Sequence, residues 1–95
     1  MNEQMIERSE EVARILKLLG HPKRLLLLCS ISDGEKSVSE LEKVCNASQS
    51  QVSQFLKMME ALGLIVGRRE GNFIFYRIKD ERVKSLIQSL YKLFC

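Results

Sequence analysis

The sequence predicts a mainly helical α+β fold, and three features of its second half carry this prediction. Two helices, expected at residues 38–44 and 48–62, are joined by a link of only a few residues. The second of them combines an apolar face with a face of Ser and Gln side chains. Two short β-rich segments with basic residues follow, separated by Gly71-Asn72. A helix pair followed by a basic hairpin is typical of a winged helix-turn-helix.

The first two helices are expected in the N-terminal third of the chain. Apolar residues recur at helical spacing over residues 3–19, and Gly20 is a common type of helix end. Pro22 is permitted in a first turn, so it can start a second helix that extends to about Ser32. The run LLLLC makes this helix apolar on nearly all sides. We therefore expect it to form the buried centre of the fold.

Capping residues mark where the later helices begin. Ser37 and Glu40 have the spacing of a capping box, which predicts the start of the short third helix. Ser48 can cap the fourth helix, and Gly63 ends it. Asp80 can cap the last helix, residues 81–94.

The expected element order is α-α-α-α-β-β-α, with strands at residues 64–69 and 73–78. The 95 residues are enough for one small domain, so residues 1–95 are assigned to a single winged helix-turn-helix domain. The apolar stripes on the first and last helices exceed what so small a core needs. They predict that these two helices form the interface of a two-fold homodimer.

Composition narrows the class of protein. Hydrophobic residues make up 45% of the chain, which excludes disorder, yet the longest apolar run, Leu25 to Cys29, has only five residues. A membrane span needs about 20. The N-terminus lacks the basic-then-apolar pattern of a signal peptide, so a cytoplasmic protein without membrane contact is expected. Its three cysteines should therefore be mostly reduced, and they are too few for a closed disulfide framework.

Charge and side-chain chemistry point to double-stranded DNA as the partner. The net charge is +3, and residues 48–79 hold five basic and two acidic side chains. Hydroxyl and amide groups both donate and accept hydrogen bonds, which suits base edges in a major groove. The residues expected to face base edges or nearby phosphates are Ser48, Gln49, Ser50, Gln51, Ser53 and Gln54. Those expected to bind the DNA backbone or the minor groove are Lys57, Arg68, Arg69, Asn72 and Tyr76.

Two other classes of function fit less well. A winged-helix module that binds proteins instead of DNA would need an apolar outer face on the helix at residues 48–62. That face instead presents Gln49, Ser50 and Gln51. An enzyme would need a base beside a nucleophile. The single histidine, His21, lies in a His-Pro helix start, and no acidic partner for a cysteine is evident. We therefore expect no catalytic residue and no cofactor.

Four segments together resemble the ArsR/SmtB family of bacterial repressors, from about residue 12 to the end of the chain. They are GHPKRLLLLCSI, SVSELEK, SQSQVSQFLKMMEALGLI and RREGNFIFYRI. The resemblance implies a homodimeric winged-helix repressor that binds an inverted-repeat operator and releases it when an inducer binds. Phe55 departs from the family, in which many members have a polar residue or His at this position. We expect Phe55 either to pack beneath the hairpin or to contact a thymine methyl group.

Metal-sensing members of this family carry ligands that the present sequence lacks. Arsenic and cadmium sensors have a Cys-Val-Cys motif where this chain has Ser37, Val38 and Ser39. Zinc and nickel sensors use Asp and His pairs on the last helix, and residues 80–95 contain no histidine. A tetrahedral zinc site needs four such ligands. We therefore predict that the protein has no metal site.

The positions of Cys29 and Cys95 resemble the dithiol branch of the family, the SqrR/BigR type of sulfide and persulfide sensors. That resemblance implies a redox sensor in which a reactive sulfur species bridges the two thiols, by a disulfide or a longer polysulfide. Cys95 is the candidate for first attack, with Lys92 offsetting the unfavourable helix end, and Cys29 is the resolving thiol. Cys45 is interpreted as structural. Taken singly, Cys29 could instead be a core residue and Cys95 an exposed terminal thiol.

Two alternatives remain within the same fold. A regulator of the HlyU type would respond to peroxide and act by displacing a silencer. A metal-responsive repressor of the ArsR type is the other.

Overall fold

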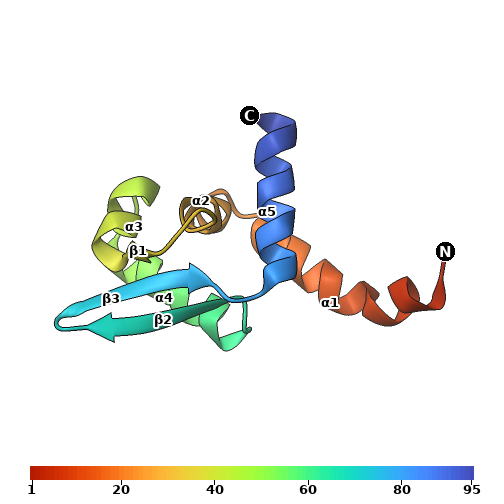
Figure 1. Ribbon diagram of the computed structural model, residues 1–95, viewed down its shortest axis with the longest axis horizontal. Helices are drawn as coiled ribbons and strands as arrows, with labels where there is room; N and C mark the ends of the chain where they lie inside the picture. Colours follow the sequence, from red (N-terminus) through yellow and green to blue (C-terminus); the bar gives the residue numbers. More distant parts are fainter.

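Five helices and a three-stranded sheet make up the computed structural model, which describes all residues from Met1 to Cys95 (Figure 1). The helices are α1 (Glu3–Leu19), α2 (Pro22–Ser30), α3 (Val38–Cys45), α4 (Gln49–Ala61) and α5 (Glu81–Phe94). The strands are β1 (Lys36–Ser37), β2 (Ile65–Glu70) and β3 (Phe73–Ile78). The winged helix-turn-helix expected from the sequence is confirmed, with α3 and α4 as the helix pair and β2–β3 as the wing.

The helix starts are those that the capping residues predicted. At α3, the Ser37 hydroxyl accepts a hydrogen bond from the Glu40 amide, and the Glu40 carboxylate accepts one from the Ser37 amide. Ser48 accepts from the amide of Gln51 to cap α4, and Asp80 caps α5 in the same way. These side chains satisfy amides that have no partner within a first turn, so they fix where each helix begins.

The sheet contains one strand that the sequence did not reveal. Its order is β1-β3-β2 with antiparallel neighbours, and Lys36 and Ser37 of β1 pair with Tyr76 and Phe75 of β3. A two-residue strand has no periodic pattern by which it could be recognised. Its effect is to fasten the start of α3 to the wing, so the helix pair and the hairpin form one unit.

The core lies where α2, α3, α4 and α5 meet beneath the sheet. The expectation that α2 is buried on nearly all sides is only partly right. Leu27 and Leu28 are completely buried, but Leu26 is 41% exposed, and the helix ends at Ser30 rather than at about Ser32. The helix is not covered all round, because its neighbours α1, α3, α4 and α5 reach only part of its circumference.

The first and last helices leave apolar side chains uncovered. The N-terminal end of α1 runs away from the rest of the molecule, and the end of α5 is also free (Figure 1). The large exposed apolar residues on these helices are Met5, Ile6, Leu16, Tyr91, Leu93 and Phe94. Such a set is unusual on a small monomer. No helix here has both the length and the apolar content needed to cross a bilayer.

Candidate DNA-binding surface and thiol pair

The polar residues predicted to contact DNA from α4, called the reading helix below, lie on an outer face and on two flanks of this helix. Val52, Leu56 and Met59 are buried and hold the helix on the core. On the opposite side Ser50, Gln54 and Lys57 are exposed. Ser48 and Gln49 are exposed at the start of the helix, whereas Gln51 and Ser53 are half-buried on opposite flanks. The sequence pattern grouped these six polar residues as one face, and the structure separates them.

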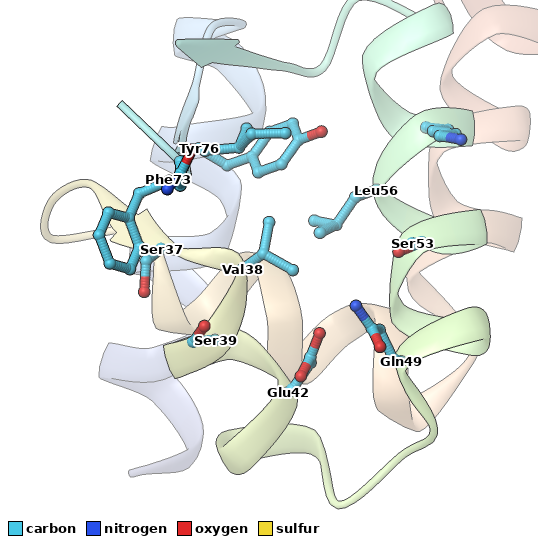
Figure 2. A pocket seen from close by; sticks show the side chains of 12 residues that line it. Ser37, Val38, Ser39, Glu42, Gln49, Ser53, Leu56, Phe73 and Tyr76 are labelled. Carbon is cyan, nitrogen blue, oxygen red and sulfur yellow. The ribbon is translucent and has the colours of Figure 1, made fainter. Parts of the chain in front are cut away.

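One flank of α4 borders a groove that leads to the wing. The groove has a volume of about 320 Å³ and lies between α3, α4 and β3 (Figure 2). Gln49, Ser53 and Lys57 line it from α4, while Asn72 and Phe73 line it from the wing. It therefore joins the two elements expected to contact DNA. Glu42 of α3 also lines it, and Figure 2 shows this carboxylate close to Gln49.

The other flank of α4 rests on the start of α2. Phe55 packs there, with its ring edge-on to His21 at a centroid distance of 5.0 Å and with the Arg24 guanidinium 5.0 Å from the ring centroid. The expectation that Phe55 packs beneath the wing is therefore wrong. Its partners come from residues more than thirty positions earlier in the chain, which spacing within the helix cannot indicate.

The two neighbouring arginines of the wing have different surroundings. The Arg68 guanidinium makes hydrogen bonds of 2.6–2.9 Å to Glu35, pairs with Glu70 at 2.9 Å, and lies 4.8 Å from the Phe75 ring centroid. Hydrogen bonding from Arg68 holds the pKa of the Glu35 carboxyl below its usual range. Arg69 makes no ion pair. Arg69 and Arg77 are thus the wing cations without an acidic partner, whereas Arg68 fastens the wing to the loop before β1.

Tyr76 was expected to contact DNA, and its burial does not fit that role. The side chain is 7% exposed, and burial with the nearby charge of Glu60 raises the pKa of its hydroxyl. The ring lies against Gly67 so closely that a Cβ there would be 2.9 Å from a ring carbon. Tyr76 therefore acts as the packing residue of the wing, and Gly67 provides the space for it.

Replacing Arg69 by Ala should weaken binding to specific and random DNA alike and lower the slope of log K against log salt concentration by about 1, because one phosphate contact is lost. Replacing Arg68 by Ala is the matched control. It removes the same charge from the same strand, but it also leaves Glu35 and Glu70 without their partner. We expect Arg68→Ala to destabilise the wing in thermal unfolding, whereas Arg69→Ala should not. Equal salt slopes for Arg69→Ala and the parent, measured by fluorescence anisotropy, would contradict the assignment.

Cys29 lies on α2 and Cys95 follows the end of α5, and the charge of Cys95 acts on the Cys29 thiol. Both thiols are free, with Cys29 half-buried and Cys95 exposed. Burial raises the pKa of the Cys29 thiol, and the charge of Cys95 raises it further. An open cavity of about 340 Å³ adjoins Cys29, and its other lining residues are Ser32, Asp33, Gln88 and Tyr91. A small sulfur compound therefore has access to Cys29 from the side on which α5 lies.

Cys45 has a different environment. It is buried at the end of α3, and its thiol donates to the backbone carbonyl of Lys23 at 3.7 Å. Burial raises its pKa. Nowhere in the protomer do three His, Cys, Asp or Glu side chains come together as metal ligands. Of the serines that replace the metal-binding cysteines, Ser37 is engaged in the α3 capping box.

Sequence reasoning missed three residues of these surfaces. Glu35 is isolated in a loop and gave no signal before its pairing with Arg68 was seen. Glu42 occupies an ordinary position on an amphipathic helix. Lys23 follows the helix-starting Pro22, and the sequence gave no sign that it reaches α4.

Comparison with known proteins identifies relatives over nearly the whole chain. The family described as "Bacterial regulatory protein, arsR family" matches residues 21–66. The biofilm growth-associated repressor of Agrobacterium fabrum is 43% identical over 91 residues, covering 96% of this chain and 78% of the relative. These values indicate common ancestry throughout the domain.

Solved structures agree with the fold in detail. The transcriptional repressor BigR from Xylella fastidiosa superposes with a TM-score of 0.90 at 41% identity, covering 100% of this chain and 98% of that one. Reduced HlyU from Vibrio cholerae gives a TM-score of 0.91 at 34% identity and covers 99% of both chains. A winged-helix domain from Mycobacterium bovis, with a TM-score of 0.79 at 27% identity and coverage of 98% and 86%, is described as homodimeric.

Proposed function

Because the chain belongs to the arsR family of bacterial regulatory proteins, we propose that it is a homodimeric transcriptional repressor whose inducer is a persulfide. In the repressing state, α4 and the β2–β3 wing bind operator DNA. In the induced state, a bridge of sulfur atoms joins Cys29 and Cys95, and the operator is released.

The DNA-binding half of this proposal is supported by the outer face of α4 and by the wing. Ser50, Gln54 and Lys57 point away from the core on a helix of 13 residues, a suitable size for a major groove. Asn72 at the wing tip and the unpaired Arg69 can reach the backbone beside it. Pairing of two protomers through the uncovered faces of α1 and α5 would present two such helices, which fits an inverted-repeat operator.

The sensing half is supported above all by one observation, the pair of free thiols on α2 and at the end of α5, of which Cys29 adjoins an open cavity. Cys95 is exposed, so it can make the first attack. Its thiolate takes the outer, sulfane sulfur from a persulfide RSSH, which leaves as the thiol RSH. The Cys29 thiol then attacks the new Cys95 persulfide, forms a disulfide and releases hydrogen sulfide. The persulfide is the oxidant, so no other reactant is needed.

Bridging changes the position of α5 in the dimer. Cys95 is the last residue after α5, whereas Cys29 is built into α2, which is anchored by Leu27 and Leu28 in the core. A covalent link therefore draws the end of α5 towards α2. Because α5 belongs to the proposed dimer interface, the angle between protomers changes, and the two α4 helices lose the spacing of the operator half-sites.

Replacing Cys29 or Cys95 by Ser tests this proposal directly. Both variants should bind DNA as the parent does, but they should not release it after treatment with glutathione persulfide. The parent should lose affinity by about 5- to 150-fold, the usual range of allosteric coupling. Cys45→Ser is the matched control, since it removes a buried thiol outside the pair, and it should respond like the parent. A Cys95→Ser variant that still releases DNA would refute the sensing mechanism.

The likeness to HlyU supports one rival, since the structure of that relative is described as reduced HlyU. In this rival, hydrogen peroxide oxidises one thiol to a sulfenic acid, and the second thiol displaces water to form the disulfide. Both routes end in the same disulfide, so the two inducers are distinguished by the intermediate, a persulfide or a sulfenic acid, which is trapped and identified by mass spectrometry. Release by peroxide at concentrations where persulfide has no effect would favour the rival.

A metal-responsive repressor is the other rival, and zinc provides its test. Reduced protein titrated with zinc or cadmium should keep its operator affinity nearly unchanged, because no three potential ligands converge within the protomer. Stoichiometric metal that releases DNA at submicromolar concentration would overturn the dithiol proposal.

A further inference from the structure

The start of α2 meets the flank of the reading helix at two points along α4. Lys23 Nζ donates a hydrogen bond to Gln51 Oε1 at 3.3 Å. One turn later on α4, Phe55 packs against His21 and Arg24, with both ring-centroid distances at 5.0 Å. The Phe55 contact fixes how α4 lies on α2. The ammonium of Lys23 is therefore held beside Gln51, one turn before Phe55 along α4.

Lys23 itself is fixed by contacts on both sides of its backbone. Its amide donates to His21 Nδ1 at 3.2 Å, and its carbonyl accepts from Cys45 Sγ at 3.7 Å. No carboxylate pairs with its ammonium. Gln51 Oε1 is therefore its one side-chain partner, and the geometry of the pair is set by three elements, α2, α3 and α4.

We propose that Lys23 is a positioning residue that determines which base Gln51 reads, an inference that rests on the proposed DNA reading by α4. An ammonium group only donates hydrogen bonds, so it holds the amide oxygen of Gln51 towards α2 and leaves the NH₂ group for the DNA. Gln reads adenine in a bidentate manner, with its oxygen accepting from N6 and its nitrogen donating to N7. With its oxygen held by Lys23, Gln51 offers only donors to the DNA and loses the bidentate pairing with adenine, so it prefers bases that present acceptors without a neighbouring donor, namely guanine with N7 and O6 or thymine with O4.

The inference can be tested without knowledge of the natural operator. A pool of duplexes with a random core is selected with the reduced parent and with each variant, and the bound sequences are read. Gln51→Ala should lose base preference at one position per half-site. Lys23→Met keeps the length of the side chain but removes the donor, so the amide can turn. Adenine should then gain about tenfold relative to guanine or thymine at that same position, with all other positions unchanged.

Matched variants separate this role from a general loss of charge. Lys43→Met removes a cation from the exposed surface of α3 and should leave every base preference as in the parent. Lys23→Arg retains a donor and should restore the parental preference. Lys23→Leu, which also has no donor, should act like Lys23→Met, and it provides a second variant if the methionine disturbs folding.

The outcomes distinguish the inference from the function on which it rests. If the parent selects no preferred sequence, DNA reading by α4 is itself refuted. If Gln51→Ala loses one position but both Lys23→Met and Lys23→Leu keep the parental preference there, the positioning role is refuted and DNA reading stands. Uniform weakening on all sequences by the Lys23 variants would also refute it, since that is the result expected of a phosphate contact.

Discussion

Replacing Leu28 by Ala is expected to lower the free energy of unfolding by about 2–5 kcal/mol, the usual cost of deleting a fully buried leucine side chain and leaving a cavity. Leu28 is 0% exposed, and its helix α2 packs against α1, α3 and α5. No neighbour can easily fill the space, because each of these helices is fixed by its own contacts. The loss is a large part of the stability of a small domain.

Leu26 provides the matched control, two positions earlier in the same run of leucines. Its side chain is 41% exposed, so Leu26→Ala should change the free energy of unfolding by less than about 1 kcal/mol. Both variants are compared by urea unfolding at one fixed protein concentration, since dimer formation makes stability depend on concentration. Equal losses for the two would mean that Leu26 is covered in the dimer and that the protomer alone does not define the core.

The fold was predictable because its signals are local. The capping box at Ser37 and the cap at Ser48 are properties of four consecutive residues, and the apolar spacing of α4 is a property of one helix. The strand β1 was not predictable, because it exists only through its pairing with Tyr76 and Phe75, about forty residues away. The exposure of Leu26 was missed for the same reason, since the sequence of a helix does not show how many neighbours surround it.

The candidate site was predictable in the types of its residues and less so in their roles. Ser and Gln side chains do mark the surface of α4, but only contacts with α2 and the wing separate Ser50 and Gln54 from the flanking Gln51. Arg68 and Arg69 are equivalent in sequence, and an acidic residue from a distant loop makes them different. Such pairings depend on tertiary structure, so no pattern within the hairpin could reveal them.

The bridging of Cys29 and Cys95 by persulfide should become faster by about tenfold for each pH unit, because the attacking group is the thiolate. The ordinary pKa of a thiol is about 8.5, and burial and the charge of Cys95 raise the pKa of Cys29 above that. A raised pKa keeps the thiol protonated to a higher pH. The rate of the closing step should therefore still be rising at about pH 8.5, where a solvent-exposed thiol is already half ionised.

Formation of the Cys29–Cys95 bridge is measured across this pH range by rapid quenching and mass spectrometry. These methods separate the Cys95 persulfide from the closed bridge. At low pH the persulfide should accumulate, since the attack by Cys29 is then the slow step. Alkylation of Cys29 in the Cys45→Ser/Cys95→Ser variant is the control. The pH midpoint of this alkylation reports the pKa of the Cys29 thiol. It should fall slightly because the charge of Cys95 is removed, but it should stay above the ordinary pKa of a thiol, because burial is the larger cause of the raised pKa. A closing rate that levels off below about pH 8 would show that Cys29 is not the attacking thiol in the second step.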